Sequence, residues 1–245
     1  MIDSKIKHEN TLNSGSRYAA DFDYLMHDFC MNKFSERLKG RQCLELGCYH
    51  GEMTKKLSKV CNSVMALDID EECINASKKA CLNHSNVTFF HSDFYNFKNY
   101  KNYEVIYFSH ALEHVPDDFK LISYINDQMN HNQLMITIVP NGTSLSRQIA
   151  VEMGLMKNPL EVTEFEKKIG HHRTYDINSL TNLFKSAGMT ILESGGIMPK
   201  IFSNNQFDRS LQAGIIDLNF LSALNSLSDK YGELCSSIYL VTKKG

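Results

Sequence analysis

One stretch, Cys43–Thr54 (CLELGCYHGEMT), is the most informative part of the sequence. It begins within a short apolar run, 41–46, which predicts a buried strand, and it continues through Gly47 and Gly51 into apolar residues at helical spacing. A glycine turn lets the backbone approach a ligand that a Cβ atom would repel. Ligands of open parallel sheets bind at the carboxyl ends of the strands. The stretch therefore predicts a ligand-binding turn between a strand and a helix of an α/β sheet.

Strand and helix patterns alternate on both sides of this turn. Strands separated by helical patterns imply parallel pairing through right-handed crossovers. We therefore expect one Rossmann-like α/β sheet with helices on both faces. Besides 41–46, the predicted strands are 63–68, 87–93, 103–108, 133–139, 189–193 and 236–242.

Two segments interrupt this alternation and one precedes it. Residues 1–39 are expected to form an N-terminal helical lid, with Tyr18, Phe22 and Tyr24 on its helix. Residues 40–245 form the main domain, with helical insertions over the substrate side at about 143–170 and 195–234. The second insertion is too long for an ordinary connection, which predicts a function or a local fold for it.

The composition excludes several classes of protein. The net charge of the 245 residues is −2, so the total charge gives no sign of nucleic-acid binding, and a small-molecule substrate is expected. Seven scattered cysteines without a C-x-x-C pair argue against a zinc knuckle and favour a reducing, cytoplasmic compartment. No apolar run approaches the roughly 20 residues that span a membrane, so no membrane partner is expected.

Two carboxylates after the glycine turn stand at the ends of predicted strands. Asp68 ends the second predicted strand, about twenty residues after the glycines, where a carboxylate can accept hydrogen bonds from ribose hydroxyls. Asp93 ends the third predicted strand, where it can accept from an adenine amino group. The structural alternatives are a plain turn at the glycines, a strand-end residue at Asp68 and a helix cap at Asp93. All of these positions lie at the ends of successive strands, which favours a nucleoside-containing cofactor.

In the glycine turn and in the segments around the two carboxylates, the chain resembles the class I S-adenosylmethionine (SAM)-dependent methyltransferases. Residues 43–54 resemble the first motif of that family, ALDID (66–70) the second and HSDF (91–94) the third. YEVIYFSHALEHVPD (103–117) is similar to the strand-four motif of the ubiquinone-biosynthesis-like, type 11/23-like group. The segment 170–192 resembles the late H-x-R-x-Y segment of that group, followed by a helix and a strand.

The resemblance implies a seven-stranded, mostly parallel sheet whose last strand is antiparallel. It implies SAM as the cofactor and S-adenosylhomocysteine as its product. The loop from Gly47 to Gly51 would wrap the methionine moiety, Asp68 would hold the ribose, and Asp93 with Phe94 would hold the adenine. The complete set of expected cofactor-binding residues is Glu45, Gly47, Cys48, Gly51, Asp68, Ile69, Asp93, Phe94 and Ser109.

Two rival classes bind similar cofactors. A nicotinamide-dependent dehydrogenase has closely spaced glycines, G-x-G-x-x-G, which admit a pyrophosphate at a helix N-terminus. Here Cys48, Tyr49 and His50 fill the space between the glycines and would crowd a diphosphate, whereas SAM has no phosphate. A non-catalytic SAM-binding protein would keep the loop but lack polar groups over the methyl group.

Two histidines are the candidate catalytic residues. His110 directly follows the fourth predicted strand, and His171 occupies the histidine position of the H-x-R-x-Y segment. If the acceptor is a hydroxyl, a histidine can act as general base while proximity supplies the rest of the acceleration. We therefore expect O-methylation of a small biosynthetic molecule or a sugar, with nitrogen and carbon acceptors left open. The alternative is that both histidines only position their loops.

A metal ion is a further alternative that the sequence disfavours. Glu113 and His114 share one face of a helical turn with His110, and His171 or His172 offers another ligand. Small-RNA 2′-O-methyltransferases use a similar E-x-x-E-H pattern, but here His110 replaces the first glutamate. A carboxylate-poor site disfavours Mg²⁺. The sequence therefore predicts no metal, and activity that EDTA leaves unchanged.

Overall fold

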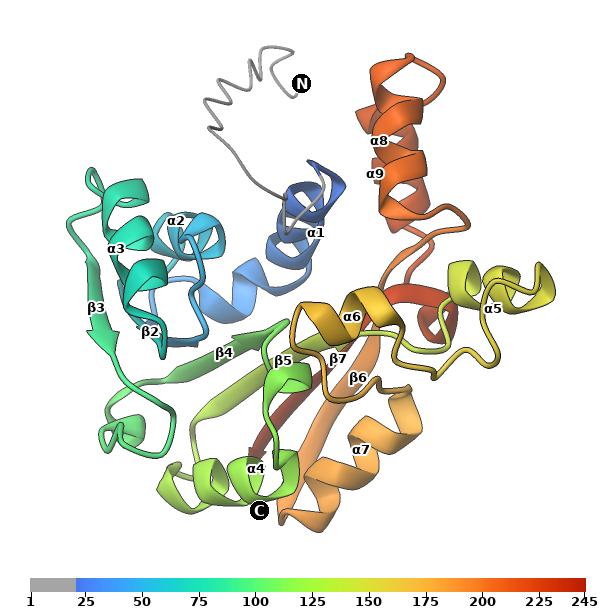
Figure 1. Cartoon of the computed structure of the whole chain (residues 1–245). Coiled ribbons are helices and arrows are strands. Elements are labelled where there is room, and N and C mark those ends of the chain that lie inside the picture. The colour runs from blue at the N-terminus through green and yellow to red at the C-terminus, as the bar shows by residue number, and fades with distance from the viewer. Residues whose placement is uncertain (1–20) are drawn as a thin grey trace.

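A seven-stranded sheet forms the centre of the computed structural model, which describes residues 21–245 (Figure 1). Its strand order is β3-β2-β1-β4-β5-β7-β6. Strands β1 to β5 pair in parallel, and β7 runs antiparallel to both of its neighbours, β5 and β6. This arrangement confirms the predicted fold. The strands are β1 (Gln42–Leu46), β2 (Ser63–Asp68), β3 (Val87–His91), β4 (Val105–Ser109), β5 (Leu134–Pro140), β6 (Met189–Pro199) and β7 (Cys235–Lys244).

Helices cover both faces of the sheet. Figure 1 shows α1, α2 and α3 on one side and α4 and α7 on the other. The shorter α5 and α6 follow β5, and α8 and α9 stand together beyond the end of β6. None of the helices in residues 21–245 combines the length and the apolar character that a membrane crossing needs. The helices are α1 (Asp21–Leu38), α2 (Glu52–Ser58), α3 (Glu71–Ala80), α4 (Asp118–Gln128), α5 (Leu145–Glu152), α6 (Glu164–Lys168), α7 (Ile177–Ser186), α8 (Asn204–Gln212) and α9 (Leu218–Asn225).

The central strands are buried on both faces because they alternate between two cores. In β4, Val105 and Tyr107 pack into the core beneath α1 and α2, whereas Ile106 and Phe108 pack into the core beneath α4 and α7. All four side chains are fully buried. Parallel strands that are covered on both faces have nearly continuous apolar sequences, and this pattern allowed the strand to be predicted.

Strands β4, β5 and β7 end one or two residues later than predicted, and the ends of β3 and β6 differ from the prediction for reasons that the structure shows. Strand β3 ends at His91 rather than 93, because the carboxylate of Asp93 accepts hydrogen bonds from the next backbone N–H groups and turns the chain. Strand β6 extends from the predicted end at 193 to Pro199 and pairs with β7 over this length. The predicted insertion at about 195–234 therefore begins within β6, where a Cβ at Gly195 would lie 2.8 Å from the Tyr239 hydroxyl.

The N-terminal helix joins the core through its first aromatic residue. Phe22 is fully buried, and its ring stacks on that of Phe207 in α8, with ring centroids 4.7 Å apart. Tyr24 makes an edge contact with His27, and Tyr18 lies outside the described residues. These contacts make Phe22 a core residue, and the role of the segment as a lid remains a prediction.

Candidate active site

The glycine loop between β1 and α2 has the backbone conformation that its sequence predicts. Gly47 and Gly51 have φ angles of 80° and 85°, in the left-handed region that favours glycine. A Cβ atom at Gly47 would lie 2.9 Å from the Cβ of Ala111, which follows β4 by two residues. The loop therefore passes close to the carboxyl end of β4, and only glycine permits that approach.

Asp68 holds this loop from the end of β2. Its Oδ2 accepts a hydrogen bond of 2.8 Å from the backbone N–H of Tyr49, and its Oδ1 accepts one of 3.0 Å from Asp70. Tyr49 has a φ of 45°, which is uncommon for a bulky residue. The adjacent Ile69 is 67% exposed at the end of the strand. Asp68 thus stabilises a strained loop residue, and Ile69 leaves an apolar surface open beside it.

Two of the expected cofactor residues lie beneath the loop rather than on its surface. Glu45 is only 2% exposed, and its Oε2 accepts a hydrogen bond of 2.6 Å from the Thr54 hydroxyl of α2. Burial raises the pKa of Glu45 to about 8. Cys48 is also buried, and its sulfur accepts a hydrogen bond from Ser77. Both side chains support the loop from inside.

The residues expected at the adenine lie beside the same edge. Asp93 accepts hydrogen bonds from the backbone N–H groups of Tyr95 and Asn96, so its carboxylate also closes a turn. The helix-cap alternative had anticipated this kind of contact. The ring of Phe94 packs edge-on against Phe108, with centroids 5.5 Å apart. Ser109 is the last residue of β4 and is partly buried.

His110 occupies an unusual position immediately after β4. Its φ is 51°, another left-handed value in a residue that is not glycine. Backbone outliers of this kind cluster at functional sites. Its Nε2 lies 3.4 Å from the Ser237 hydroxyl of β7, and its Nδ1 lies 3.8 Å from Oε1 of Glu113. Burial, followed by the charges that His27 and His171 would carry, lowers the pKa of His110, so the ring is neutral at neutral pH.

His171 reaches the same region from the loop between α6 and α7. Ligand atoms of Glu113, His114 and His171 lie within 4.8 Å of one another, and the rings of the two histidines meet edge-on with centroids 4.6 Å apart. Burial raises the pKa of Glu113 to about 8 and lowers that of His114 to about 4. Because Glu113 contacts His110, the structure brings both candidate catalytic histidines to one cluster.

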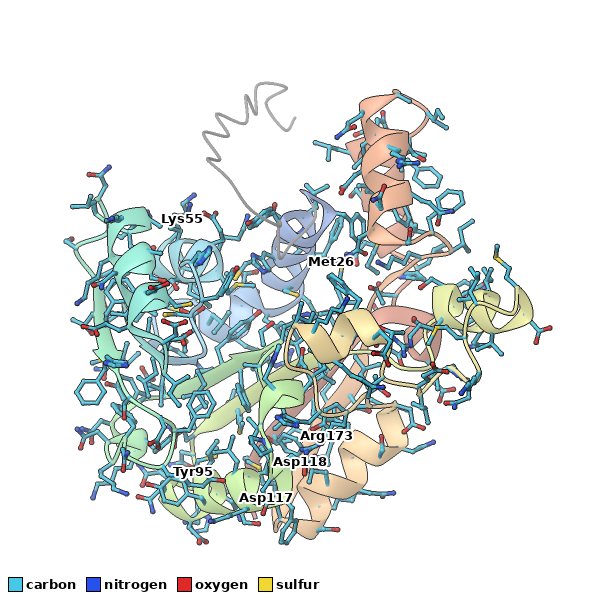
Figure 2. The ribbon with its side chains drawn as sticks, viewed as in Figure 1. Met26, Lys55, Tyr95, Asp117, Asp118 and Arg173 are labelled. Atoms are coloured by element: carbon cyan, nitrogen blue, oxygen red, sulfur yellow. The ribbon has the colours of Figure 1, made fainter. Side chains whose placement is uncertain are left out.

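The loop that carries His171 is fixed by its neighbours. The backbone N–H of His172 donates to the carbonyl of Glu113 at 2.9 Å. Arg173 forms an ion pair of 3.0 Å with Asp118 at the start of α4, and Tyr175 donates a hydrogen bond to the same carboxylate. Figure 2 labels Arg173 and Asp118 side by side. Arg173 and Tyr175 therefore hold the loop against the start of α4.

Three residues near His110 were not singled out from the sequence. His27 of α1 and Lys200 after β6 both lie close enough for their charges to lower the pKa of His110. Ser237 contacts His110 directly and pairs with Pro140 across the β5–β7 ladder. Ser237 could have been found from the sequence if the pairing of the predicted strands 133–139 and 236–242 had been known. No pattern in the sequence pointed to His27 or Lys200.

Solved structures with the same fold include two methyltransferases and one other enzyme. Magnesium protoporphyrin IX methyltransferase (ChlM) from Synechocystis PCC 6803, with bound S-adenosylhomocysteine, has a TM-score of 0.60 and 13% identity, covering 94% of this chain and 90% of that chain. N-methyltransferase NodS from Bradyrhizobium japonicum WM9, in complex with S-adenosylhomocysteine, has a TM-score of 0.56 and 11% identity, with coverages of 93% and 89%. The cyclase SpnF has a TM-score of 0.58 and 12% identity, with coverages of 87% and 81%. At these identities the similarity shows the fold alone.

Sequence comparison shows the family. No curated protein sequence matches the chain at a significant level. Residues 18–194, which are more than half of the chain, match the family model described as a methyltransferase domain. The predicted enzyme class, a transferase of methyl groups, is thereby confirmed. In agreement with its resemblance to the class I SAM-dependent methyltransferases, the chain belongs to the methyltransferase domain family.

Proposed function

We propose that the protein transfers a methyl group from SAM to an oxygen atom of a small biosynthetic molecule. The observation that carries this proposal is the meeting of the Gly47–Gly51 loop, Asp68 and His110 at the carboxyl ends of neighbouring strands β1, β2 and β4. The loop fits a cofactor without phosphates, because bulky side chains, Cys48, Tyr49 and His50, stand between its glycines where a diphosphate-binding loop has closely spaced glycines. The family match also favours methyl transfer over the dehydrogenase alternative.

The residues of the chain have distinct roles in this proposal. SAM supplies an electrophilic methyl group on a sulfonium ion, and the protein positions the acceptor in line with it. Asp68 and the glycine loop hold the cofactor. The neutral imidazole of His110 would accept the proton of the acceptor hydroxyl as its oxygen bonds to the methyl carbon, and bound SAM would supply that carbon, with the electron pair of the S–C bond retained by sulfur. His171 is the second candidate for the proton acceptor, since it lies in the same cluster.

An apolar pocket beyond the end of β6 is a candidate site for the body of the acceptor. It has a volume of about 270 Å³ and lies among the end of β6, α8 and α9. Lys200 lines the pocket, and its charge reaches His110. Apolar pockets with few polar groups suit apolar ligands, so we favour an acceptor with an apolar body over a sugar. The apolar side chains include Leu145, Phe202, Phe207, Phe220 and Leu224.

The cofactor part of the proposal is tested by calorimetry with SAM, S-adenosylhomocysteine and NAD. We expect binding of SAM in the micromolar range, about −8 kcal/mol. Acceptors are then sought by incubating the protein and methyl-labelled SAM with fractions of small molecules, and by detecting labelled products by mass spectrometry. Binding of NAD without binding of SAM would replace this proposal with the dehydrogenase. Binding of SAM without any labelled product would favour a non-catalytic SAM-binding protein.

The role of His110 is tested with the acceptor so identified. We expect His110→Ala to lower kcat by about 10²–10⁴-fold, the usual contribution of a general base, while the affinity for SAM is retained. Added imidazole should restore part of the rate, because a free base can enter the space of the lost ring. His131→Ala, at an exposed position in the turn before β5, is the matched control. A rate within a fewfold of the wild type would show that His110 only positions its loop.

A further inference from the structure

The cluster of Glu113, His114 and His171 has the composition of a metal site. Glu113 and His114 lie in a short 3₁₀ turn, Leu112–His114, and His171 comes from the loop that follows α6. Their ligand atoms lie within 4.8 Å of one another. The cluster offers two imidazole nitrogens and one carboxylate oxygen, from segments 57 residues apart in the chain, counting from His114 to His171.

Two atoms of this cluster lack the partners that their burial requires. Glu113 is 2% exposed, and its Oε2 makes no hydrogen bond to any of residues 21–245. Nδ1 of His171 is also buried and has no hydrogen-bond partner within that range. Leaving a buried polar group unsatisfied costs about 1–3 kcal/mol, and more for a charged group. Arg173 does not relieve Glu113, because it pairs with Asp118.

We propose that Glu113, His114 and His171 bind a divalent transition-metal ion of the Zn²⁺ type. One ion would neutralise the buried carboxylate and would give the unsatisfied imidazole nitrogen a partner. Two histidines and one carboxylate, with an open position, form a known donor set for Zn²⁺ and related ions, whereas Mg²⁺ prefers oxygen ligands. Tetrahedral bonds of about 2.1 Å place ligand atoms about 3.4 Å apart, so the cluster closes by a shift of about 1 Å.

The surroundings of the three residues suit this role. The backbone N–H of His171 donates to the carbonyl of Glu166 at 2.9 Å, which fixes the start of its loop. Nδ1 of His114 lies next to Gly170, and a hydrogen bond with that backbone contributes to its pKa. Metal-binding histidines are commonly oriented by a hydrogen bond of this kind. The proposal replaces the expectation from the sequence that no metal binds, and it makes His171 a ligand and leaves His110 as the proton acceptor.

Metal binding can be measured without cofactor or acceptor, so its failure is distinguishable from failure of the proposed function. The full chain is stripped with EDTA, dialysed and titrated with Zn²⁺ by calorimetry and with Co²⁺ by visible absorption. We expect one equivalent to bind, with weak absorption bands of Co²⁺ in nitrogen and oxygen coordination. Glu113→Gln keeps the size of the side chain but removes its charge, and it should weaken binding at least tenfold. His171→Ala should have the same effect.

His172→Ala is the matched control, because His172 neighbours His171 but its exposed side chain is not part of the cluster. It should bind the metal as the wild type does. Circular dichroism checks that each variant folds. The proposal is overturned if the folded wild type binds no equivalent of Zn²⁺ or Co²⁺. It is also overturned if Glu113→Gln and His171→Ala both bind as tightly as the wild type, or if the Co²⁺ bands indicate thiolate ligands.

Discussion

Replacing Asp68 by alanine should separate cofactor binding from fold stability. The Asp68 carboxylate accepts hydrogen bonds from the backbone of Tyr49 and of Asp70, and its place at the end of β2 is where a ribose would lie. The variant loses both acceptor atoms at once. It also releases Tyr49 from the left-handed conformation in which the carboxylate helps to hold it.

The size of the effect follows from the kind of interaction lost. A hydrogen bond to a charged group contributes about 1.5–3 kcal/mol. At about 1.4 kcal/mol for each tenfold change, this corresponds to a dissociation constant for SAM that rises about 10- to 140-fold. A left-handed conformation in a residue that is not glycine costs of the order of 1–3 kcal/mol. In the variant, SAM binding must restore this conformation of Tyr49 without help from the carboxylate, so the loosened loop should weaken SAM binding further.

Calorimetry with SAM gives the affinity, and urea unfolding gives the stability of the same samples. The matched control is Asp70→Ala, because Asp70 caps α3 by accepting from Glu72 at 2.8 Å. Its loss should cost about 1 kcal/mol of stability and leave the affinity for SAM within about twofold. If Asp68→Ala binds SAM as well as this control does, the carboxylate does not hold the ribose and the reasoning is refuted.

Two further substitutions test the loop from other directions. Gly47→Ala should destabilise the protein and abolish measurable SAM binding, because the new Cβ would lie 2.9 Å from the Cβ of Ala111 and the residue has a φ of 80°. Unchanged SAM binding in calorimetry would contradict this expectation. Glu45→Gln should flatten the pH dependence of stability. In the folded wild type the pKa of Glu45 is raised from 4.5 to about 8, so the unfolded chain releases this proton at a lower pH than the folded protein does. The wild type therefore loses stability as the pH rises from 4.5 to about 8, by up to about 1.4 kcal/mol per pH unit. Urea unfolding at pH 5 and pH 8 measures the difference, and equal slopes for both proteins would show that Glu45 is ionised throughout.

The sheet and the glycine loop after β1 could be predicted because local rules determine them. Strands such as 63–68 are apolar, short and bounded by helical patterns, and the structure places β2 at these residues. Gly47 and Gly51 stand where the backbone needs left-handed φ angles. The position of Asp68 follows from the same strand. In each case the residues that decide the structure are close together in the sequence.

Features that depend on distant partners could not be predicted. The length of β6 depends on pairing with β7, and Tyr239 of β7 fills the space beside its Gly195. His110 could be placed at the end of β4, but His171 lies in the loop between α6 and α7, so its position beside Glu113 depends on how that loop packs. The unsatisfied carboxylate oxygen of Glu113 could not be predicted from the sequence, because the loop around His171 creates its environment.

The position of β7 has a consequence for the order in which the protein is built during synthesis. Strand β6 precedes β7 in the chain, yet within residues 21–245 β6 pairs with β7 alone, and β7 lies between it and β5. A ribosome-bound chain that ends before β7 can pair β1 to β5 as they emerge, but β6 then has no neighbour in the sheet. Ser237 of β7 is also the residue that contacts His110. The contact between Ser237 and His110, the proton acceptor that we propose, therefore forms only when β7 joins the sheet, after β1 to β5 can already have paired.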